Sequence, residues 1–206
     1  METALQEVLK PAHSAILAID IQNDPCHPEG LYAKLGRDIS LRQQAAHNAA
    51  AFIDKARKFN LAVIFVKLNH SKWNESPAWI RRSKLRGPWT VAYKEGTWGE
   101  QFYAVQPKEE DPIVIKHRYS AFVGTDLEMI LRSRNITTLI VTGGGTAACV
   151  ESTVRHGLCL DYDILVISDC CGSSTVGEHG PALKRMDGLG ATVVESGGVL
   201  ETLGQL

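Results

Sequence analysis

The chain has 206 residues, of which 44% are hydrophobic and 22% are charged, and its formal net charge is −1. This length and balance predict a soluble α/β domain with its own core, and they argue against a nucleic-acid partner or an anionic membrane surface. No apolar run is long enough to span a bilayer, and the first residues lack the charged-then-apolar order of a signal peptide.

The cysteines of the chain are five in number, at positions 26, 149, 159, 170 and 171. An odd number without C-x-x-C or Cys/His spacing indicates neither a disulfide framework nor a zinc site. The sequence therefore predicts a reducing, cytoplasmic setting, and it predicts no metal and no other cofactor.

Short apolar runs alternate along the chain with stretches of helical periodicity. Strands are expected at residues 14–21, 61–68, 112–115, 139–141, 162–167 and 191–194, and helices at residues 40–60, 125–134 and 178–189, after residue 146 and from residue 197 on. This alternation predicts one domain over residues 1–206, a doubly wound, mostly parallel six-stranded sheet with helices on both faces. Residues 1–13 are expected to be a loosely held lead-in.

Residues 69–108 do not follow this alternation. The segment holds all four tryptophans of the chain, with basic residues interleaved among the aromatic ones. Such interleaving can indicate single-stranded nucleic-acid binding. A lid or a subunit contact is the favoured interpretation, because long ordered insertions are usually functional and the chain as a whole is not basic. A large aromatic patch also predicts a homo-oligomer, a dimer or a tetramer.

The stretch LIVTGGGTAACVESTVRHG, residues 139–157, has the order strand, glycine turn, helix. Cys149 is expected in the first turn of that helix, beside free N–H groups and the positive end of the helix dipole. This placement predicts a lowered thiol pKa and an oxyanion site, and so a nucleophile. A small buried cysteine packed under a turn is the alternative that this stretch leaves open.

Two further chemical groups stand at strand ends. Asp20 ends the first strand and Lys116 ends the third, while Cys149 follows the fourth. In a doubly wound sheet these positions can converge at one carboxyl edge. An acid could move the thiol proton, and a lysine could hold the carboxylate and stabilise a thiolate.

The segments AILAIDIQND, VIKHRYSAFVGTDL and VTGGGTAACVESTVRHG, in this order, resemble the isochorismatase-like cysteine hydrolases, and the middle segment looks closest to the ureidoacrylate and biuret-type amidohydrolases. The resemblance implies a catalytic triad of Asp20, Lys116 and Cys149. It also implies a cis peptide at Gly144–Gly145 and an oxyanion hole formed by the N–H groups of Gly145 and Cys149.

The resemblance further implies that Asn69 and Tyr119 line the pocket and contact the substrate. The expected reaction is cleavage of a C–N bond in a small amide or ureido substrate through a thioester, with release of ammonia or an amine. The family's metal-binding members carry an Asp/His/His site after the second strand, whereas this chain has LNHSKWN, with only His70. Isochorismatases proper lack the nucleophilic cysteine, so Cys149 argues against vinyl-ether hydrolysis.

Three alternatives stay open. A hydrolase of this fold could act on another small amide, a hydrazide or an ester. The glycines between a strand and a helix could bind a dinucleotide, with Asp169 as the nearest ribose-binding acid, although the third glycine of G-x-G-x-x-G is missing. The adjacent Cys170 and Cys171 could indicate a non-catalytic, redox-responsive protein, although adjacent cysteines seldom bond without strain.

Overall fold

The computed structural model describes residues 2–86 and 92–206. In this part of the chain six strands form one parallel sheet in the order β3-β2-β1-β4-β5-β6. The strands are β1 (Ser14–Ile19), β2 (Ala62–Leu68), β3 (Ile113–Lys116), β4 (Thr138–Gly144), β5 (Asp163–Gly172) and β6 (Thr192–Val194). The predicted doubly wound α/β fold is therefore confirmed.

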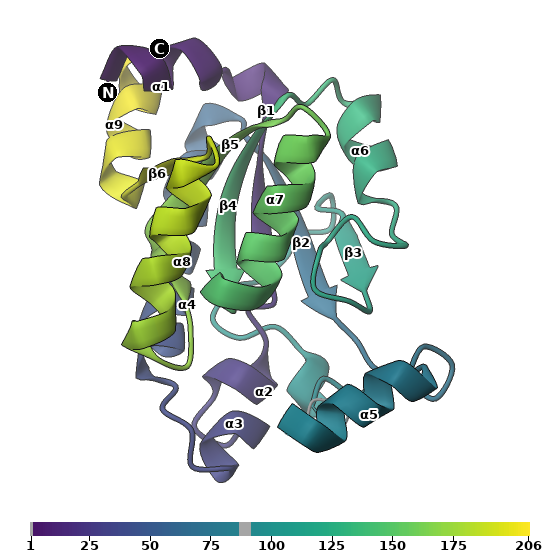
Figure 1. Cartoon of the computed structure of the whole chain (residues 1–206). Coiled ribbons are helices and arrows are strands. Elements are labelled where there is room, and N and C mark those ends of the chain that lie inside the picture. The colour runs from purple at the N-terminus through teal and green to yellow at the C-terminus, as the bar shows by residue number, and fades with distance from the viewer. Residues whose placement is uncertain (1, 87–91) are drawn as a thin grey trace.

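Helices cover both faces of the sheet (Figure 1). They are α1 (Glu2–Val8), α2 (Asn23–Cys26), α3 (Leu31–Lys34), α4 (Ser40–Ala56), α5 (Pro77–Arg86), α6 (Leu127–Ser133), α7 (Glu151–Cys159), α8 (Val176–Gly188) and α9 (Ser196–Gln205). Short 3₁₀ turns lie at η1 (Pro11–His13), η2 (Arg57–Phe59) and η3 (Trp98–Glu100), and a π-helical turn lies at η4 (Thr146–Val150).

Alternation along β1 separates two hydrophobic cores, because successive side chains of a strand point to opposite faces. Leu17 belongs to the core under α6, α7 and α8, where it is clustered with residues such as Val154. Ile16 belongs to the core under α4, α9 and α1, which includes Phe52. The central strands are thus buried on both sides, as in parallel sheets generally, whereas Ile113 and Ile115 of the edge strand β3 are exposed.

The first residues of the chain are not loosely held. Leu5 and Leu9, one helical turn apart, are buried in the second core together with Leu203 of α9. Figure 1 shows α1 next to α9, with the two chain ends close together. The prediction of a loose lead-in was wrong because these two leucines share one helix face and bury it.

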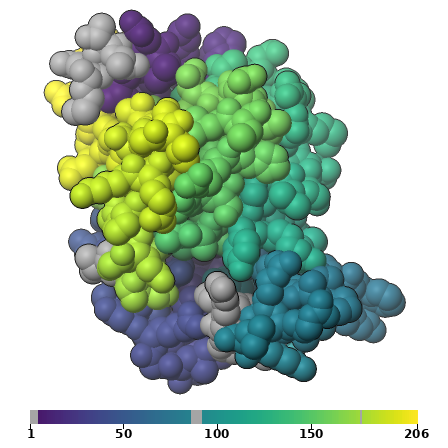
Figure 2. All heavy atoms as spheres, viewed as in Figure 1, coloured from purple at the N-terminus to yellow at the C-terminus, as the bar shows by residue number. Residues whose placement is uncertain are grey.

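The segment after β2 lies at the carboxyl end of the sheet, next to α2 and α3 (Figure 1). In the space-filling view, α5 and the loop before it form a lobe at that end (Figure 2). Trp73 is 85% exposed and Trp79 is 6% exposed, whereas Trp89 lies outside the described residues. The aromatic residues therefore have different surroundings: Trp79 and Tyr93 are buried, whereas Trp98 is 44% exposed.

Candidate active site

Asp20 follows the last residue of β1, at the carboxyl end of the sheet. Its side chain is 2% exposed and its φ of 52° is in the left-handed region, which non-glycine residues seldom adopt. The Asp20 N–H donates to the carbonyl of Val66 at 2.8 Å, which fixes the backbone in this conformation. Such strain is typical of residues held for a functional purpose.

Lys116, the last residue of β3, connects the predicted triad. Its ammonium is fully buried and lies 2.8 Å from Asp20 Oδ2 and 3.2 Å from Cys149 Sγ, and it donates to the carbonyl of Arg118 at 3.0 Å. These three partners match the three N–H donors of an ammonium. Burial alone would lower the pKa of Lys116, but the charge of Asp20 and the hydrogen bond to Cys149 raise it. The structure thus brings together the three side chains that the sequence placed at strand ends.

Cys149 lies in the π-helical turn η4, directly after the glycine turn. Burial, followed by the charge of Asp20, raises the pKa of the Cys149 thiol to about 12, and the nearby Lys116 offsets this only in part. The prediction of a lowered thiol pKa was wrong, because loss of hydration at a buried sulfur exceeds the effect of one ammonium and a helix end. Burial and the neighbouring Asp20 carboxylate thus favour the protonated thiol in the free protein.

The turn before Cys149 differs from the prediction in two ways. No peptide bond in the described residues is cis, so the predicted cis bond at Gly144–Gly145 was wrong. The backbone turns instead through Gly145, whose φ of 75° a glycine adopts at little cost, whereas a non-proline cis bond costs about 3 kcal/mol. The Gly145 N–H donates to the carbonyl of Gly172 at 2.7 Å, so it is not free to hold an oxyanion as predicted.

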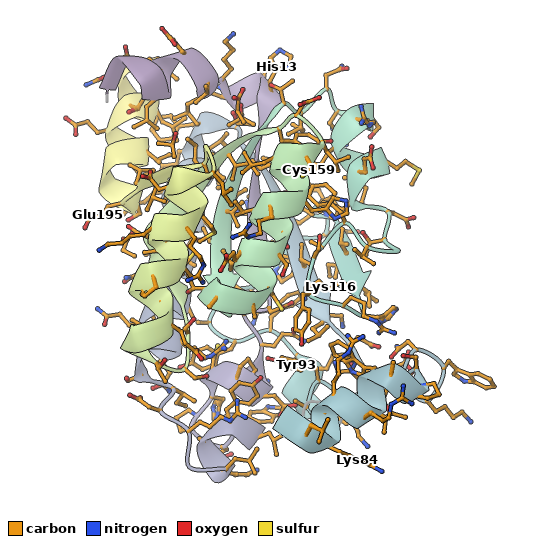
Figure 3. All side chains as sticks on the ribbon, in the orientation of Figure 1. His13, Lys84, Tyr93, Lys116, Cys159 and Glu195 are labelled. Atoms are coloured by element: carbon orange, nitrogen blue, oxygen red, sulfur yellow. The ribbon has the colours of Figure 1, made fainter. Side chains whose placement is uncertain are left out.

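A cavity of about 320 Å³ opens above the triad. Asp20, Cys149 and both turn glycines, Gly144 and Gly145, line it, and so does Tyr119, as predicted. Figure 3 shows Lys116 and Tyr93 toward this same end of the sheet, with Tyr93 next to α5. The cavity is large enough for a small molecule and places it against the thiol.

Asn69 does not line this cavity. Its side-chain amide donates to Glu100 Oε1 at 3.0 Å and accepts from Asn74 at 3.4 Å, within a buried network that also holds Lys67. The next residue, His70, faces the cavity instead. The predicted role of Asn69 was wrong because the chain leaves the sheet after β2, and the neighbouring residue then points toward the site.

Aromatic rings form one wall of the cavity, and the contacts between neighbouring rings give the order of the rings along it. Tyr32 lies next to Tyr93, with ring centroids 6.3 Å apart, and Tyr93 lies 6.4 Å from His70. His70 is followed by Trp79 at 5.3 Å and then by Tyr119 at 5.5 Å. The segment after β2 therefore supplies three rings of the wall to the site of its own chain. Neither ring nitrogen of His70 nor Nε1 of Trp79 has a hydrogen-bond partner among the described residues.

Arg42, in the first turn of α4, also lines the cavity and was not recognised from the sequence. It is 8% exposed, and its guanidinium stacks over the Tyr32 ring at 5.3 Å. The sequence contains one indication that Arg42 could be buried, since position 42 is adjacent to the apolar stripe of α4. Arginine beside such a stripe usually extends to solvent, so the sequence alone did not distinguish it.

The residues behind the two other site hypotheses have structural roles. The Asp169 carboxylate accepts hydrogen bonds from the N–H and the hydroxyl of Ser196, at 2.8 and 2.6 Å, at the start of α9. Cys170 and Cys171 are free and buried, and burial raises the pKa of both thiols. Within the described residues no group of three or more His, Cys, Asp or Glu side chains is arranged to hold a metal ion, and no helix there is long and apolar enough to cross a membrane.

The fold and the site together define a doubly wound α/β hydrolase. Residues 14–197 match the isochorismatase domain family. The chain is also 30% identical over 195 residues to the ureidoacrylate amidohydrolase RutB of Klebsiella pneumoniae, a match that covers 87% of this chain and 79% of the relative. The chain therefore belongs to the isochorismatase family, as the sequence resemblance implied.

Solved structures agree with this assignment. A cysteine hydrolase from Pseudomonas syringae matches with a TM-score of 0.83 at 22% identity, over 96% of this chain and 95% of that one, which shows the shared fold. N-carbamoylsarcosine amidase from Thermoplasma acidophilum matches with a TM-score of 0.72 at 25% identity, over 89% of this chain and 96% of that one. These relatives confirm the predicted enzyme class, a hydrolase acting on C–N bonds other than peptide bonds.

Proposed function

We propose that the protein is a cysteine-dependent amidohydrolase that cleaves a small amide, ureido or carbamoyl substrate through a thioester. The observation that carries the proposal is the position of Lys116 Nζ, 2.8 Å from Asp20 Oδ2 and 3.2 Å from Cys149 Sγ, beside a cavity that fits a small molecule. The amidohydrolase names of the relatives RutB and N-carbamoylsarcosine amidase support the substrate class.

Attack on the substrate begins from the protonated thiol, because its pKa is raised to about 12. Asp20 takes the S–H proton as the sulfur bonds to the carbonyl carbon, and the electron pair of the C=O bond moves to the oxygen. The triad starts with one negative charge, on Asp20, and one positive charge, on Lys116. After the transfer the negative charge is on the substrate oxygen. The positive charge of the Lys116 ammonium is therefore balanced by one negative charge at each stage.

Collapse of this intermediate breaks the C–N bond. Asp20 returns its proton to the leaving nitrogen, and ammonia or an amine departs from a thioester on Cys149, which is a thiocarbamate if the carbonyl was ureido. A water molecule then loses a proton to Asp20 as it attacks, and the sulfur leaves and recovers the proton. The N–H of Cys149 is our candidate donor to the oxyanion, because the N–H of Gly145 is bonded to Gly172.

The test compares two cysteines of the same chain. Ammonia release is measured from ureidoacrylate, biuret, N-carbamoylsarcosine, nicotinamide and maleamate, using the unmodified protein, Cys149→Ala and Cys159→Ala. Cys159 is exposed at the far end of α7 (Figure 3). Loss of about 10³-fold or more in Cys149→Ala alone is expected for a nucleophile. Full activity in Cys149→Ala would refute the covalent route.

The intermediate itself can be detected. Rapid acid quenching during turnover, followed by digestion and mass measurement of the peptides, is expected to show an acyl or carbamoyl adduct on the peptide that contains Cys149. An adduct elsewhere, or turnover with none at any quench time, would contradict a thioester at this residue.

A hydrolase of another small amide, a hydrazide or an ester is the second candidate. It uses the same triad, because a thiol attacks each of these carbonyls in the same way. A homo-oligomer and a cytoplasmic location remain predictions; sedimentation velocity and fractionation of cells test them.

A further inference from the structure

Arg118, just after β3, has a side chain that no step of the proposed reaction uses. The Cζ atom of its guanidinium lies 5.0 Å over the centre of the Trp79 ring. Nη2 donates to the carbonyl of Asn74 at 3.0 Å, and Nη1 donates to the carbonyl of His117 at 2.6 Å. The side chain thus joins the end of β3 to the segment that carries Trp79.

The lobe formed by α5 and the loop before it, residues 71–86, projects from the rest of the molecule (Figure 2). Its inward side chains, Trp79 and Ser83, are buried and lie one helical turn apart, whereas Leu85 on the other side of α5 is exposed. Trp79 lines the cavity, and its Nε1 has no hydrogen-bond partner among the described residues. The indole is therefore held by the rings and the guanidinium that surround it.

The main chain of Arg118 reaches the triad. Its carbonyl accepts a hydrogen bond of 3.0 Å from the Lys116 ammonium, whose other two partners are Asp20 and Cys149. Arg118 therefore contacts the triad with its main chain and the lobe with its side chain. A movement of this backbone that released the lobe would also move an acceptor of Lys116 Nζ, so the position of the lobe and the geometry of the ammonium are linked.

The partners of the Arg118 guanidinium are two carbonyls and one aromatic ring. No carboxylate lies within ion-pair distance of it in the described chain, whereas Arg57 pairs with Asp111 and Arg185 pairs with Glu151. One cation–π contact and one hydrogen bond connect Arg118 to the lobe. Together they are expected to favour a closed over an open lobe by about 10- to 100-fold, which still allows the lobe to open.

From these contacts we propose that Arg118 is a positioning residue that holds the lobe closed, so that Trp79 stays in the cavity wall and limits access to Cys149. A closed lobe excludes water and larger molecules from the reacting sulfur, and a reversible contact lets substrate enter and product leave. The inference rests on the proposed function for the reaction that closure protects. Closure itself is tested through the reactivity of the thiol, without turnover.

The experiment compares two alkylating reagents of different size in the Cys159→Ala background. Iodoacetamide can enter the cavity of about 320 Å³, whereas an iodoacetamide that carries fluorescein is too large to fit within it. Both reagents have the same reactive group, so the ratio of their rates at Cys149 reports access to the sulfur and does not depend on the thiol pKa. Arg118→Ala is expected to raise the rate of the large reagent about 10-fold relative to the small one, with the modified peptide identified by mass.

Further variants test whether the arginine acts through the indole. Trp79→Ala is expected to raise the ratio by itself, and adding Arg118→Ala is expected to raise it by less than about 3-fold more, because the contact is already lost. Arg118→Lys keeps a cation and loses the planar fork, so it is expected to restore part of the closed state. Arg132→Ala is the control, since Arg132 is exposed and pairs with Glu128 of its own helix, and the ratio is expected to stay unchanged.

Turnover of a substrate found by ammonia release separates positioning from a general loss of structure. Arg118→Ala is expected to raise KM about 10-fold, because only the closed fraction of the protein presents the complete cavity wall to the substrate. The value of kcat is expected to stay within about 3-fold, because Asp20 still holds the Lys116 ammonium. Melting temperatures of all variants establish that each one is folded.

Several outcomes would overturn the inference. An unchanged ratio in Arg118→Ala would show that the arginine does not limit access, and equal acceleration of both reagents would indicate general loosening of the fold. Effects of Arg118→Ala and Trp79→Ala that multiply in full would show that the two residues act independently. A fall in kcat with KM unchanged would assign Arg118 to support of Lys116 alone. Size-selective access without Cys149-dependent hydrolysis would refute the proposed function and leave the closing role of Arg118 standing.

Discussion

The helix α4 and the turn after it carry an arginine near each end, and each arginine lines a cavity at one end of the sheet. At the amino end, Arg57 lines a cavity of about 580 Å³ and forms a bidentate pair with Asp111, which also accepts from the Lys108 N–H at 2.7 Å. At the carboxyl end, Arg42 lines a cavity of about 320 Å³ and has no carboxylate partner in the described chain.

The difference between these two cavities shows which property identifies a site. In the larger cavity Arg57 is already paired with Asp111, so a ligand that bound to either side chain would have to compete with this ion pair. The smaller cavity contains an unpaired cation, a histidine and an indole without partners, and the Asp20–Lys116–Cys149 group. Unsatisfied polar groups, which a fold tolerates only when something compensates for them, are more informative than volume.

The largest effect is expected from the ion pair under the smaller cavity. Lys116→Met leaves the Asp20 carboxylate buried without a counter-ion, which is expected to cost about 3–5 kcal/mol of stability and about 10³-fold or more in activity. Denaturant unfolding and ammonia release measure the two losses. Asp20→Asn combined with Lys116→Met is expected to recover stability and not activity. Recovery of activity in the double variant would exclude a role for the pair in the chemistry.

The second-largest effect is expected in the rate at which Cys149 is alkylated as the pH changes, because this rate depends on the fraction of thiolate. With a thiol pKa of about 12, the thiolate fraction rises about tenfold per pH unit through neutral pH. Alkylation of Cys149 by iodoacetamide is therefore expected to accelerate about 100-fold between pH 7 and pH 9, read by intact mass in the Cys159→Ala background. A rate that reaches a plateau near pH 7 would instead support the lowered pKa that the helix end suggested.

The three strand-end residues could be predicted from the sequence because a parallel sheet brings the carboxyl ends of its strands to one edge. Asp20 and Lys116 each follow a clear apolar run, so their convergence with Cys149 needed only the strand assignments. The pKa of the thiol could not be predicted in the same way. This pKa depends on how completely the sulfur is buried in the folded chain, and no local sequence pattern predicts that.

Periodic patterns in the sequence did not predict the positions of Arg42, His70 and Asn69. Arg42 reaches the site because α4 crosses the sheet and brings its first turn to the glycine turn, a tertiary arrangement that helical periodicity does not contain. Asn69 and His70 follow the end of β2, where strand alternation no longer fixes which of two consecutive residues faces the cavity. In contrast, the spacing of Leu5 and Leu9 was a local signal for a buried helix at the start of the chain.

The two arginines are expected to differ in their effect on stability. Arg57→Gln leaves Asp111 without its bidentate partner and is expected to cost about 2–3 kcal/mol, with ammonia release unchanged. Arg42→Met removes an unpaired buried charge, and its stability is expected to stay within about 1 kcal/mol of the parent protein. Denaturant unfolding of both variants measures the contrast. Equal losses would mean that Arg42 is a structural group like Arg57.

The smallest effect is the pH dependence of stability that His70 contributes. Burial lowers its pKa to about 4 in the folded protein, from an ordinary value of 6.5, so the unfolded chain binds more protons between these values. The contribution of His70 is therefore fully present above about pH 6.5 and is lost as the pH falls toward 4. His70→Phe is expected to reduce the fall in melting temperature between pH 7 and pH 5 by on the order of 3 °C. The exposed His13, at the opposite end of the sheet (Figure 3), provides the matched control substitution, His13→Phe. An unchanged fall in His70→Phe would mean that burial does not lower the pKa of His70 in the folded protein.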